Sequence, residues 1–131
     1  MERQIRYRGY NLRNKKWIYG YYFVNRGKHF IADDGLAAPG ATWEDFEVDS
    51  ESVGQYVCTV YGVEIYEGDT VQLDYEAFFK ERFIGIVSFY ETSFCLLNKY
   101  GKVTSLAIRE GCGCTYTVIG NEYERKIKGN G

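Results

Sequence analysis

The residues best suited to binding chemistry lie near the N-terminus, where arginines alternate with aromatic side chains. Guanidinium groups contact phosphates or carboxylates, and aromatic rings stack on bases or bury against a protein surface. This pattern predicts a binding surface, and the surface fits either a protein partner or a single-stranded nucleic acid. Its predicted members are Arg6, Arg8, Tyr10, Arg13, Trp17, Tyr19 and Tyr21.

The charge distribution favours the protein partner. Residues 1–28 hold eight Lys or Arg and one acid, whereas residues 29–60 hold seven acids and no Lys or Arg. The formal net charge of −2 conceals this division. Adjacent segments of opposite charge are more easily explained by mutual neutralisation than by a polyanion partner. We therefore expect a protein partner or a homo-oligomer, and nucleic-acid binding through the basic hairpin is the alternative.

Residues for catalysis are few. The single histidine, His29, follows a strand pattern beside Phe30, which favours a packed or half-exposed strand histidine over a general base. No glycine-rich phosphate loop or nucleophile elbow occurs. The carboxylates of Glu64, Glu67 and Asp69 cluster where the chain turns, and turn capping explains them without an acid–base role. We predict no enzyme and no catalytic residue.

The four cysteines do not indicate a metal site. Cys112 and Cys114 have one residue between them, where zinc ligands usually have two to four, and Cys58 and Cys95 stand alone in strand patterns. Disulfides are not expected in a reducing cytoplasm. We predict no metal and no cofactor.

The elements that position these residues are short strands. Alternating apolar and polar residues, with β-branched and aromatic enrichment, predict strands separated by Gly, Asn and Asp turns. Arg6 and Arg8 fall on one face of the first strand and Ile5 and Tyr7 on the other. The predicted strands cover residues 5–10, 17–24, 29–32, 53–60, 63–66, 70–75, 83–90, 94–98, 103–108 and 115–119.

The sharpest turn signal lies at Glu67-Gly68-Asp69. Glycine adopts positive φ without a Cβ clash, and an aspartate side chain can accept hydrogen bonds from backbone amides in a turn. Tyr66, Glu67, Gly68 and Asp69 are therefore a predicted structural turn motif, with Gly68 at positive φ. A second reversal is expected at Tyr61-Gly62.

Two segments give weaker signals. Residues 36–52 begin as a loop. Within them Thr42 and Asp45 could cap a short helix, while Phe46 and Val48 alternate like a strand, so both alternatives remain open. Residues 76–83 have no clear period and could hold one helical turn.

The whole chain is expected to be all-β with at most a short helix. A length of 131 residues suits one domain, residues 1–131. Five short strands with tight turns in the C-terminal half suggest a small SH3-like barrel, which the N-terminal β-hairpins would extend. No apolar run approaches the roughly 20 residues of a membrane helix, and no signal peptide is visible, so we expect a cytoplasmic protein without membrane contact.

Three separated motifs also carry a family likeness. They are Ile5-Arg6-Tyr7-Arg8-Gly9-Tyr10, then Gln55-Tyr56 with Glu64-Ile65-Tyr66-Glu67-Gly68-Asp69-Thr70-Val71, and Val118-Ile119-Gly120-Asn121-Glu122-Tyr123-Glu124. Gly85-Ile86-Val87-Ser88-Phe89 and Phe94 agree with them. In this order they resemble the YopX family, small proteins encoded by bacteriophages and prophages. Two positions depart from its pattern: no Asp stands near Thr59-Val60, and Tyr10 replaces a common tryptophan. The resemblance implies phage or prophage origin, a bacterial host cell and a compact β-rich domain, and it carries over no catalytic residue.

Overall fold

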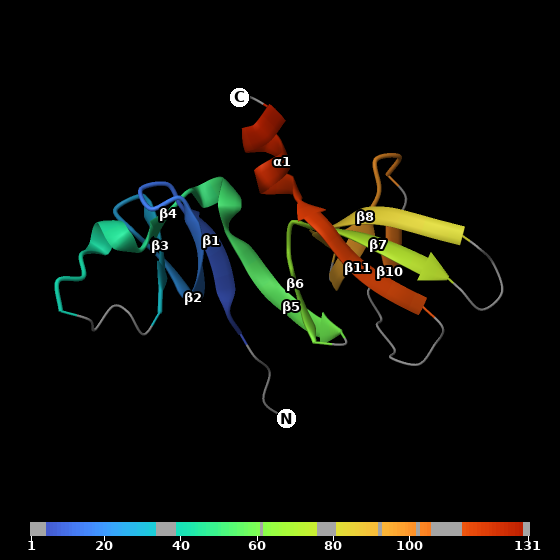
Figure 1. Cartoon of the computed structure of the whole chain (residues 1–131), viewed down its shortest axis with the longest axis horizontal. Coiled ribbons are helices and arrows are strands. Elements are labelled where there is room, and N and C mark those ends of the chain that lie inside the picture. The colour runs from blue at the N-terminus through green and yellow to red at the C-terminus, as the bar shows by residue number, and fades with distance from the viewer. Residues whose placement is uncertain are drawn as a thin grey trace. The chain divides into compact units, whose positions relative to one another are not determined.

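A computed structural model describes residues 5–33, 39–60, 62–75, 81–91, 93–101, 103–105 and 114–129 (Figure 1). These residues are mostly strands in two antiparallel sheets, with one short α-helix. The all-β prediction is confirmed. The chain divides into two compact units, Met1–Tyr56 and Val57–Gly131. That the whole chain folds as one domain stays a prediction.

The first unit is built from consecutive hairpins. Its strands are β1 (Tyr7–Asn11), β2 (Lys16–Asn25), β3 (Lys28–Ala32) and β4 (Glu47–Val48), in the order β4-β3-β2-β1, and β5 (Gly54–Val60) begins beside β1. The long strand β2 pairs with β1 over residues 16–20 and with β3 over residues 21–25. The buried side chains of Ile18, Ile31 and Val48 form the core.

Two local features explain the tight packing of these hairpins. Asn25 pairs with Lys28, so the β2–β3 connection has only two residues, Arg26 (φ 53°) and Gly27 (φ 77°). Positive φ at both positions matches the twist of the flanking strands. On β1, a Cβ at Gly9 would lie 2.8 Å from the Cβ of Val48, so only glycine lets the two strands approach this closely.

The described part of the undecided segment contains both of the alternatives left open. Trp43–Asp45 forms a 3-10 helix, whose start is held by Asp45 Oδ2 accepting from the amide (3.2 Å) and the hydroxyl (3.3 Å) of Thr42. Glu47–Val48 is strand β4, and Ser50–Ser52 is a second 3-10 helix capped by Asp49. Residues 36–38 of the predicted loop lie outside the described residues.

The second unit contains β6 (Val63–Tyr66), β7 (Asp69–Tyr75), β8 (Glu81–Tyr90), β9 (Ser93–Leu97), β10 (Val103–Ser105), β11 (Cys114–Asn121) and α1 (Glu122–Gly129). One sheet has the order β10-β9-β8-β7-β11, and β6 lies beside β5. The core comprises Val60, Ile65, Val71, Leu73, Val87 and Leu96. Among the described residues no strand pairing joins β10 to β11, so no closed barrel is found and the SH3-like barrel stays a prediction.

The structure differs from the sequence prediction at some boundaries. Residues 81–83 of the segment expected to hold a helical turn belong to β8, and residues 76–80 lie outside the described part. The last three residues of the predicted strand 103–108 lie outside it as well. Helix α1 was not predicted. No helix within the described ranges has the length and hydrophobicity needed to span a membrane.

Candidate binding surface

Strand pairing brings six of the seven predicted binding residues onto one side of the β1–β2 hairpin. Arg8 pairs with Tyr19 and Tyr10 with Trp17, and directly paired residues of antiparallel strands share a face. Arg6 and Tyr21 fall on the same side by alternation. The opposite side carries Tyr7, Ile18 and Tyr22 of the core. We call the set Arg6, Arg8, Tyr10, Trp17, Tyr19 and Tyr21 the hairpin face.

The arginines of the hairpin face lie against aromatic rings. The guanidinium carbon of Arg8 is 4.8 Å from the centroid of the Trp17 ring, and that of Arg6 is 4.6 Å from the centroid of Tyr56 on β5. Tyr10 and Trp17 meet edge to face with centroids 5.4 Å apart. Cation–π contacts of this kind contribute about 0.5–2 kcal/mol and fix the guanidinium orientation. The face is thus ordered before any partner arrives.

The seventh predicted residue, Arg13, lies in the β1–β2 turn and not on the hairpin face. Its Nη1 atom is 2.9 Å from Glu44 Oε2 and 3.8 Å from Asp45 Oδ1. This ion pair is one instance of the neutralisation expected between the basic and acidic segments. Being exposed, it contributes little stability, on the order of 0–1 kcal/mol. The pKa of Asp45 is lowered, mainly by the hydrogen bond from the Thr42 amide.

Two tyrosines give the hairpin face its contact area. Tyr21 is 76% exposed and Tyr19 is 46% exposed, while Arg8 is buried. Rigid aromatic rings bury a large area at a small entropic cost, and Tyr, Trp and Arg are the residues enriched at binding hot spots. The composition and exposure of this face therefore suit contact with another macromolecule.

Asn11 has a structural role that the sequence analysis missed. Its side chain is fully buried, and Nδ2 lies within hydrogen-bond distance of the carbonyl oxygens of Glu44 (3.2 Å), Asp45 (3.1 Å) and Glu47 (2.8 Å). Its Oδ1 accepts from the amide of Asn14 at 2.6 Å. One side chain thus ties the β1–β2 turn to the segment that precedes β4. The sequence around Asn11 indicates only a turn.

The predicted turn motif at Tyr66–Asp69 is structural, as expected. Gly68 has φ 93°, and Asp69 Oδ2 accepts from the Tyr66 amide at 2.8 Å. The Gly68 amide donates to Val87 on β8 at 2.9 Å, and its carbonyl accepts from the Glu122 amide at 2.8 Å. Tyr66 and Asp69 are buried, so the motif is an anchor within the second unit.

The closing motif is the start of helix α1. Asn121 Oδ1 accepts from the Glu124 amide at 2.7 Å, as an N-cap residue does, and Tyr123 is buried. The bond from the Glu122 amide to Gly68 joins this cap to the turn motif. Asn followed three residues later by Glu is a helix-start signal, so the sequence did contain the information that predicts α1.

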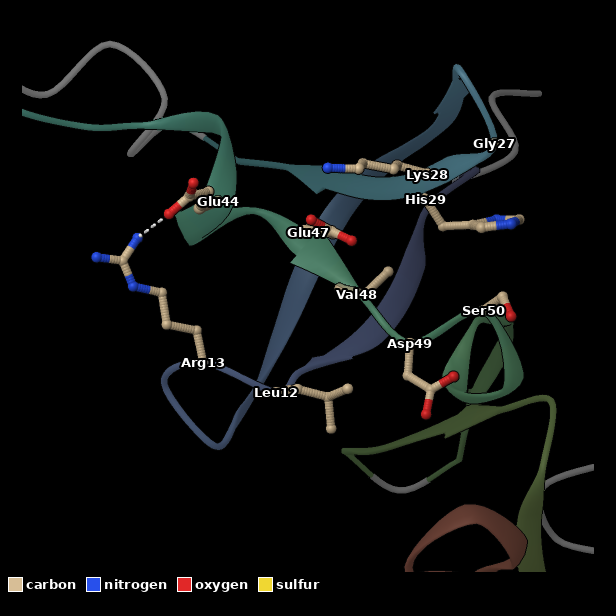
Figure 2. A pocket seen from close by; sticks show the side chains of 10 residues that line it. All are labelled: Leu12, Arg13, Gly27, Lys28, His29, Glu44, Glu47, Val48, Asp49 and Ser50. Atoms are coloured by element: carbon tan, nitrogen blue, oxygen red, sulfur yellow. Dashed lines mark hydrogen bonds and ion pairs between the residues drawn. The ribbon is translucent and has the colours of Figure 1, made fainter.

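A hollow lies beside the hairpin. It has a volume of about 560 Å³ and is lined by Leu12, Arg13, Gly27, Lys28, His29, Glu44, Glu47, Val48, Asp49 and Ser50 (Figure 2). Figure 2 shows the Arg13–Glu44 pair on one side and His29 on the other. Asp49 Oδ1 accepts from the Glu51 amide at 3.1 Å. Two of its carboxylates, those of Glu44 and Asp49, are therefore bonded within the first unit.

His29 contacts a neighbouring tyrosine, and Cys58 is partly buried. His29 Nδ1 is 2.6 Å from the hydroxyl of Tyr22, and the two rings are stacked with centroids 5.8 Å apart. His29 is half-buried, within the packed or half-exposed range expected from the sequence. Burial raises the pKa of the Cys58 thiol, which disfavours the nucleophilic thiolate.

Metal ligands do not gather within the described ranges: no group of three or more His, Cys, Asp or Glu side chains is placed to hold an ion there. Cys112 and the side chain of Cys114 fall outside those ranges, so the structural role predicted for these thiols stays a prediction.

Comparison with known proteins identifies the family. A family model described as YopX protein matches residues 6–126, which is nearly the whole chain. No curated protein and no solved structure shows significant similarity. The match includes the arginine-rich first strand, the Tyr66–Asp69 turn and the Asn121 cap. The chain belongs to the YopX family.

Proposed function

We propose that this protein is a non-enzymatic accessory protein of a phage or prophage, which acts in the cytoplasm of the bacterial host by binding protein. The hairpin face is the contact surface, and its partner is either another protein or a second copy of the chain. The proposal rests on one observation. Tyr19 and Tyr21 are exposed, and the guanidinium groups of the neighbouring Arg6 and Arg8 lie over aromatic rings.

Preorganisation supports this proposal. A long arginine side chain that is ordered only on binding costs roughly 0.5–1.5 kcal/mol of conformational entropy. Arg6 and Arg8 are held on Tyr56 and Trp17 in the free protein, so less of this cost falls on the binding step. A polar, aromatic face of this kind is typical of interfaces.

Nucleic-acid binding is the second candidate, because exposed rings beside arginines also suit stacked bases. The position of Arg13 argues against it. Arg13 lies within 4.0 Å of two carboxylates, and carboxylates beside the hairpin would repel phosphates. We therefore rank nucleic-acid binding below protein binding.

The test uses two tyrosines of equal exposure. Tyr21→Ser changes the hairpin face, and Tyr100→Ser, at 75% exposure in the second unit, is the matched control. Sedimentation velocity measures self-association over a concentration series. Affinity capture from host cells then compares the proteins retained by each variant. We expect Tyr21→Ser, and not Tyr100→Ser, to lose the self-association or the retained partner. Equal behaviour of the two variants would refute the hairpin face.

A fluorescence titration with a labelled single-stranded oligonucleotide distinguishes the second candidate. Negligible binding at physiological salt is expected. Saturable binding below about 10 μM, tighter than ordinary non-specific binding, would promote nucleic acid over protein.

A further inference from the structure

Three aromatic rings enclose a small pocket at the far end of β2. Phe23 and Phe30 pair across the β2–β3 hairpin and stack with centroids 5.2 Å apart. Trp43 meets both edge to face, at 5.8 Å from Phe23 and 5.9 Å from Phe30. The pocket has a volume of about 230 Å³, and Asn25, Arg26 and Lys28 complete its lining. We call these six residues the aromatic pocket.

The aromatic pocket continues the side of β2 that bears the hairpin face. Trp17, Tyr19, Tyr21 and Phe23 alternate along β2 and therefore share one side of it. Phe30 is buried and forms the floor, whereas Trp43 is 56% exposed. A ligand that contacts Tyr21 can thus extend along the same strand to the pocket.

The two charged residues that line the pocket are both positive, and Lys28 also lines the hollow that contains Glu44, Glu47 and Asp49. Arg26 lies in the two-residue turn and Lys28 follows it directly; both are exposed, and no acid lines the pocket. Within the part of the chain that the structure describes, neither residue forms an ion pair. This distinguishes them from Arg13, which Glu44 already neutralises. The rim therefore attracts an anionic ligand, and the walls are hydrocarbon.

The walls also decide between kinds of ring. A nucleobase has hydrogen-bonding groups around its edge, and each group that faces Phe23 or Phe30 instead of Asn25, Arg26 or Lys28 stays unpaired at a cost of about 1–3 kcal/mol. A phenylalanine or leucine side chain has no such groups. Aromatic pairs prefer stacked or edge-to-face contacts with centroids 4.5–7 Å apart, which these three rings already adopt among themselves.

We propose that the aromatic pocket binds one apolar, preferably aromatic, side chain of a partner peptide segment whose neighbouring residues are Asp or Glu. The side chain packs into the pocket beside the rings of Phe23, Phe30 and Trp43, and its acidic neighbours contact Arg26 and Lys28. This deepens the protein-binding proposal by giving the chemistry of the partner.

The two tryptophans allow a direct test by NMR. The indole N–H of Trp43 reports on the aromatic pocket and that of Trp17 on the hairpin face. The probe is an acetylated, amidated pentapeptide with phenylalanine between two pairs of glutamates, titrated into the full chain at up to several millimolar. We expect a saturable shift of the Trp43 signal. Peptides with alanine for phenylalanine, or with lysine for glutamate, should bind at least about tenfold more weakly.

A matched pair of charge reversals tests the rim. Arg26→Glu changes an exposed turn residue at φ 53°, and Lys15→Glu makes the same change at φ 52° in the other hairpin turn. Arg26→Glu should weaken the binding of the glutamate peptide about threefold to tenfold, and Lys15→Glu should leave its binding unchanged. Trp43→Ala removes the reporter and one wall. For that variant the phenyl protons of the peptide are observed, and the Trp17 signal verifies folding.

Several outcomes would overturn the proposal. They are no shift of Trp43 at saturating peptide, equal binding of the lysine peptide, tighter binding of adenosine monophosphate, or an equal loss in both charge variants. Concentration-dependent shifts of Trp43 without peptide would assign the pocket to a second copy instead. If the peptide does not bind the aromatic pocket but Tyr21→Ser still abolishes partner binding, only the pocket proposal is refuted and the hairpin face remains the contact surface.

Discussion

Replacing Asn11 should destabilise the first unit more than any exposed substitution in it. The Nδ2 group has two hydrogens shared among three backbone carbonyls, and Oδ1 accepts one further bond. Asn11→Ala removes about three hydrogen bonds from a fully buried position. At roughly 1 kcal/mol for each bond, the loss is about 3 kcal/mol, or more where water cannot replace the amide. For a chain of this size the melting temperature should fall by roughly 10 °C.

The isosteric variant Asn11→Asp separates hydrogen bonding from packing. At neutral pH it places a carboxylate against the carbonyl oxygens of Glu44, Asp45 and Glu47, so it should be less stable than Asn11→Ala. Burial there raises the pKa of the introduced carboxyl above its unfolded value. A raised folded pKa means that folding takes up a proton, so stability is gained as pH falls through that pKa and lost as pH rises.

Thermal unfolding followed by circular dichroism measures both effects, with the exposed Asn25→Ala as control. We expect a small fall in melting temperature for Asn25→Ala and a large fall for Asn11→Ala. The difference in melting temperature between Asn11→Asp and Asn11→Ala should decrease towards acidic pH. Equal melting temperatures for Asn11→Ala and Asn25→Ala would refute it. A gap independent of pH would refute the electrostatic part alone.

Three further predictions concern other parts of the chain. Gly68→Val should cost on the order of 2 kcal/mol or more, because valine is strained at φ 93°; an unchanged denaturation midpoint would contradict this. Asp45→Ala should destabilise the first unit at pH 7. Because the folded pKa of Asp45 is lowered, that difference should vanish as pH falls below the ordinary value of 3.8, which stability measurements across pH can check. Replacing Cys112 and Cys114 by serine should leave folding intact, and elemental analysis should find no stoichiometric zinc.

The strands could be predicted because their signals are local. Alternation places the described strands within about two residues of their observed bounds, except β4, whose segment was left open, and the end of β10. Gly68 was assigned to positive φ from the Glu-Gly-Asp turn alone. Helix α1 was missed because its sequence is polar and short, although Asn121 and Glu124 mark its start.

The candidate sites depend on contacts that no local pattern contains. Arg8, Tyr19 and Trp17 lie on one face because one hairpin brings them together, and their role in binding stays a prediction. Arg13 was grouped with them by charge, but the turn directs it to Glu44 instead. The three carbonyl partners of Asn11 lie more than thirty positions away, and Trp43 reaches Phe23 from beyond β3. Such pairings come from the packed fold.

The pairing of β7 with β11 has a consequence for synthesis. Asp69 at the start of β7 pairs with Asn121 at the end of β11, and the Gly68 carbonyl accepts a hydrogen bond from the amide of Glu122. A ribosome therefore releases β7, β8 and β9 before the strand that covers the other edge of β7 exists. During that interval the hydrogen-bonding groups beside Val71 and Leu73 form an open template for other nascent chains. Premature termination before residue 114 should consequently yield a product that aggregates rather than one that folds without its last strand.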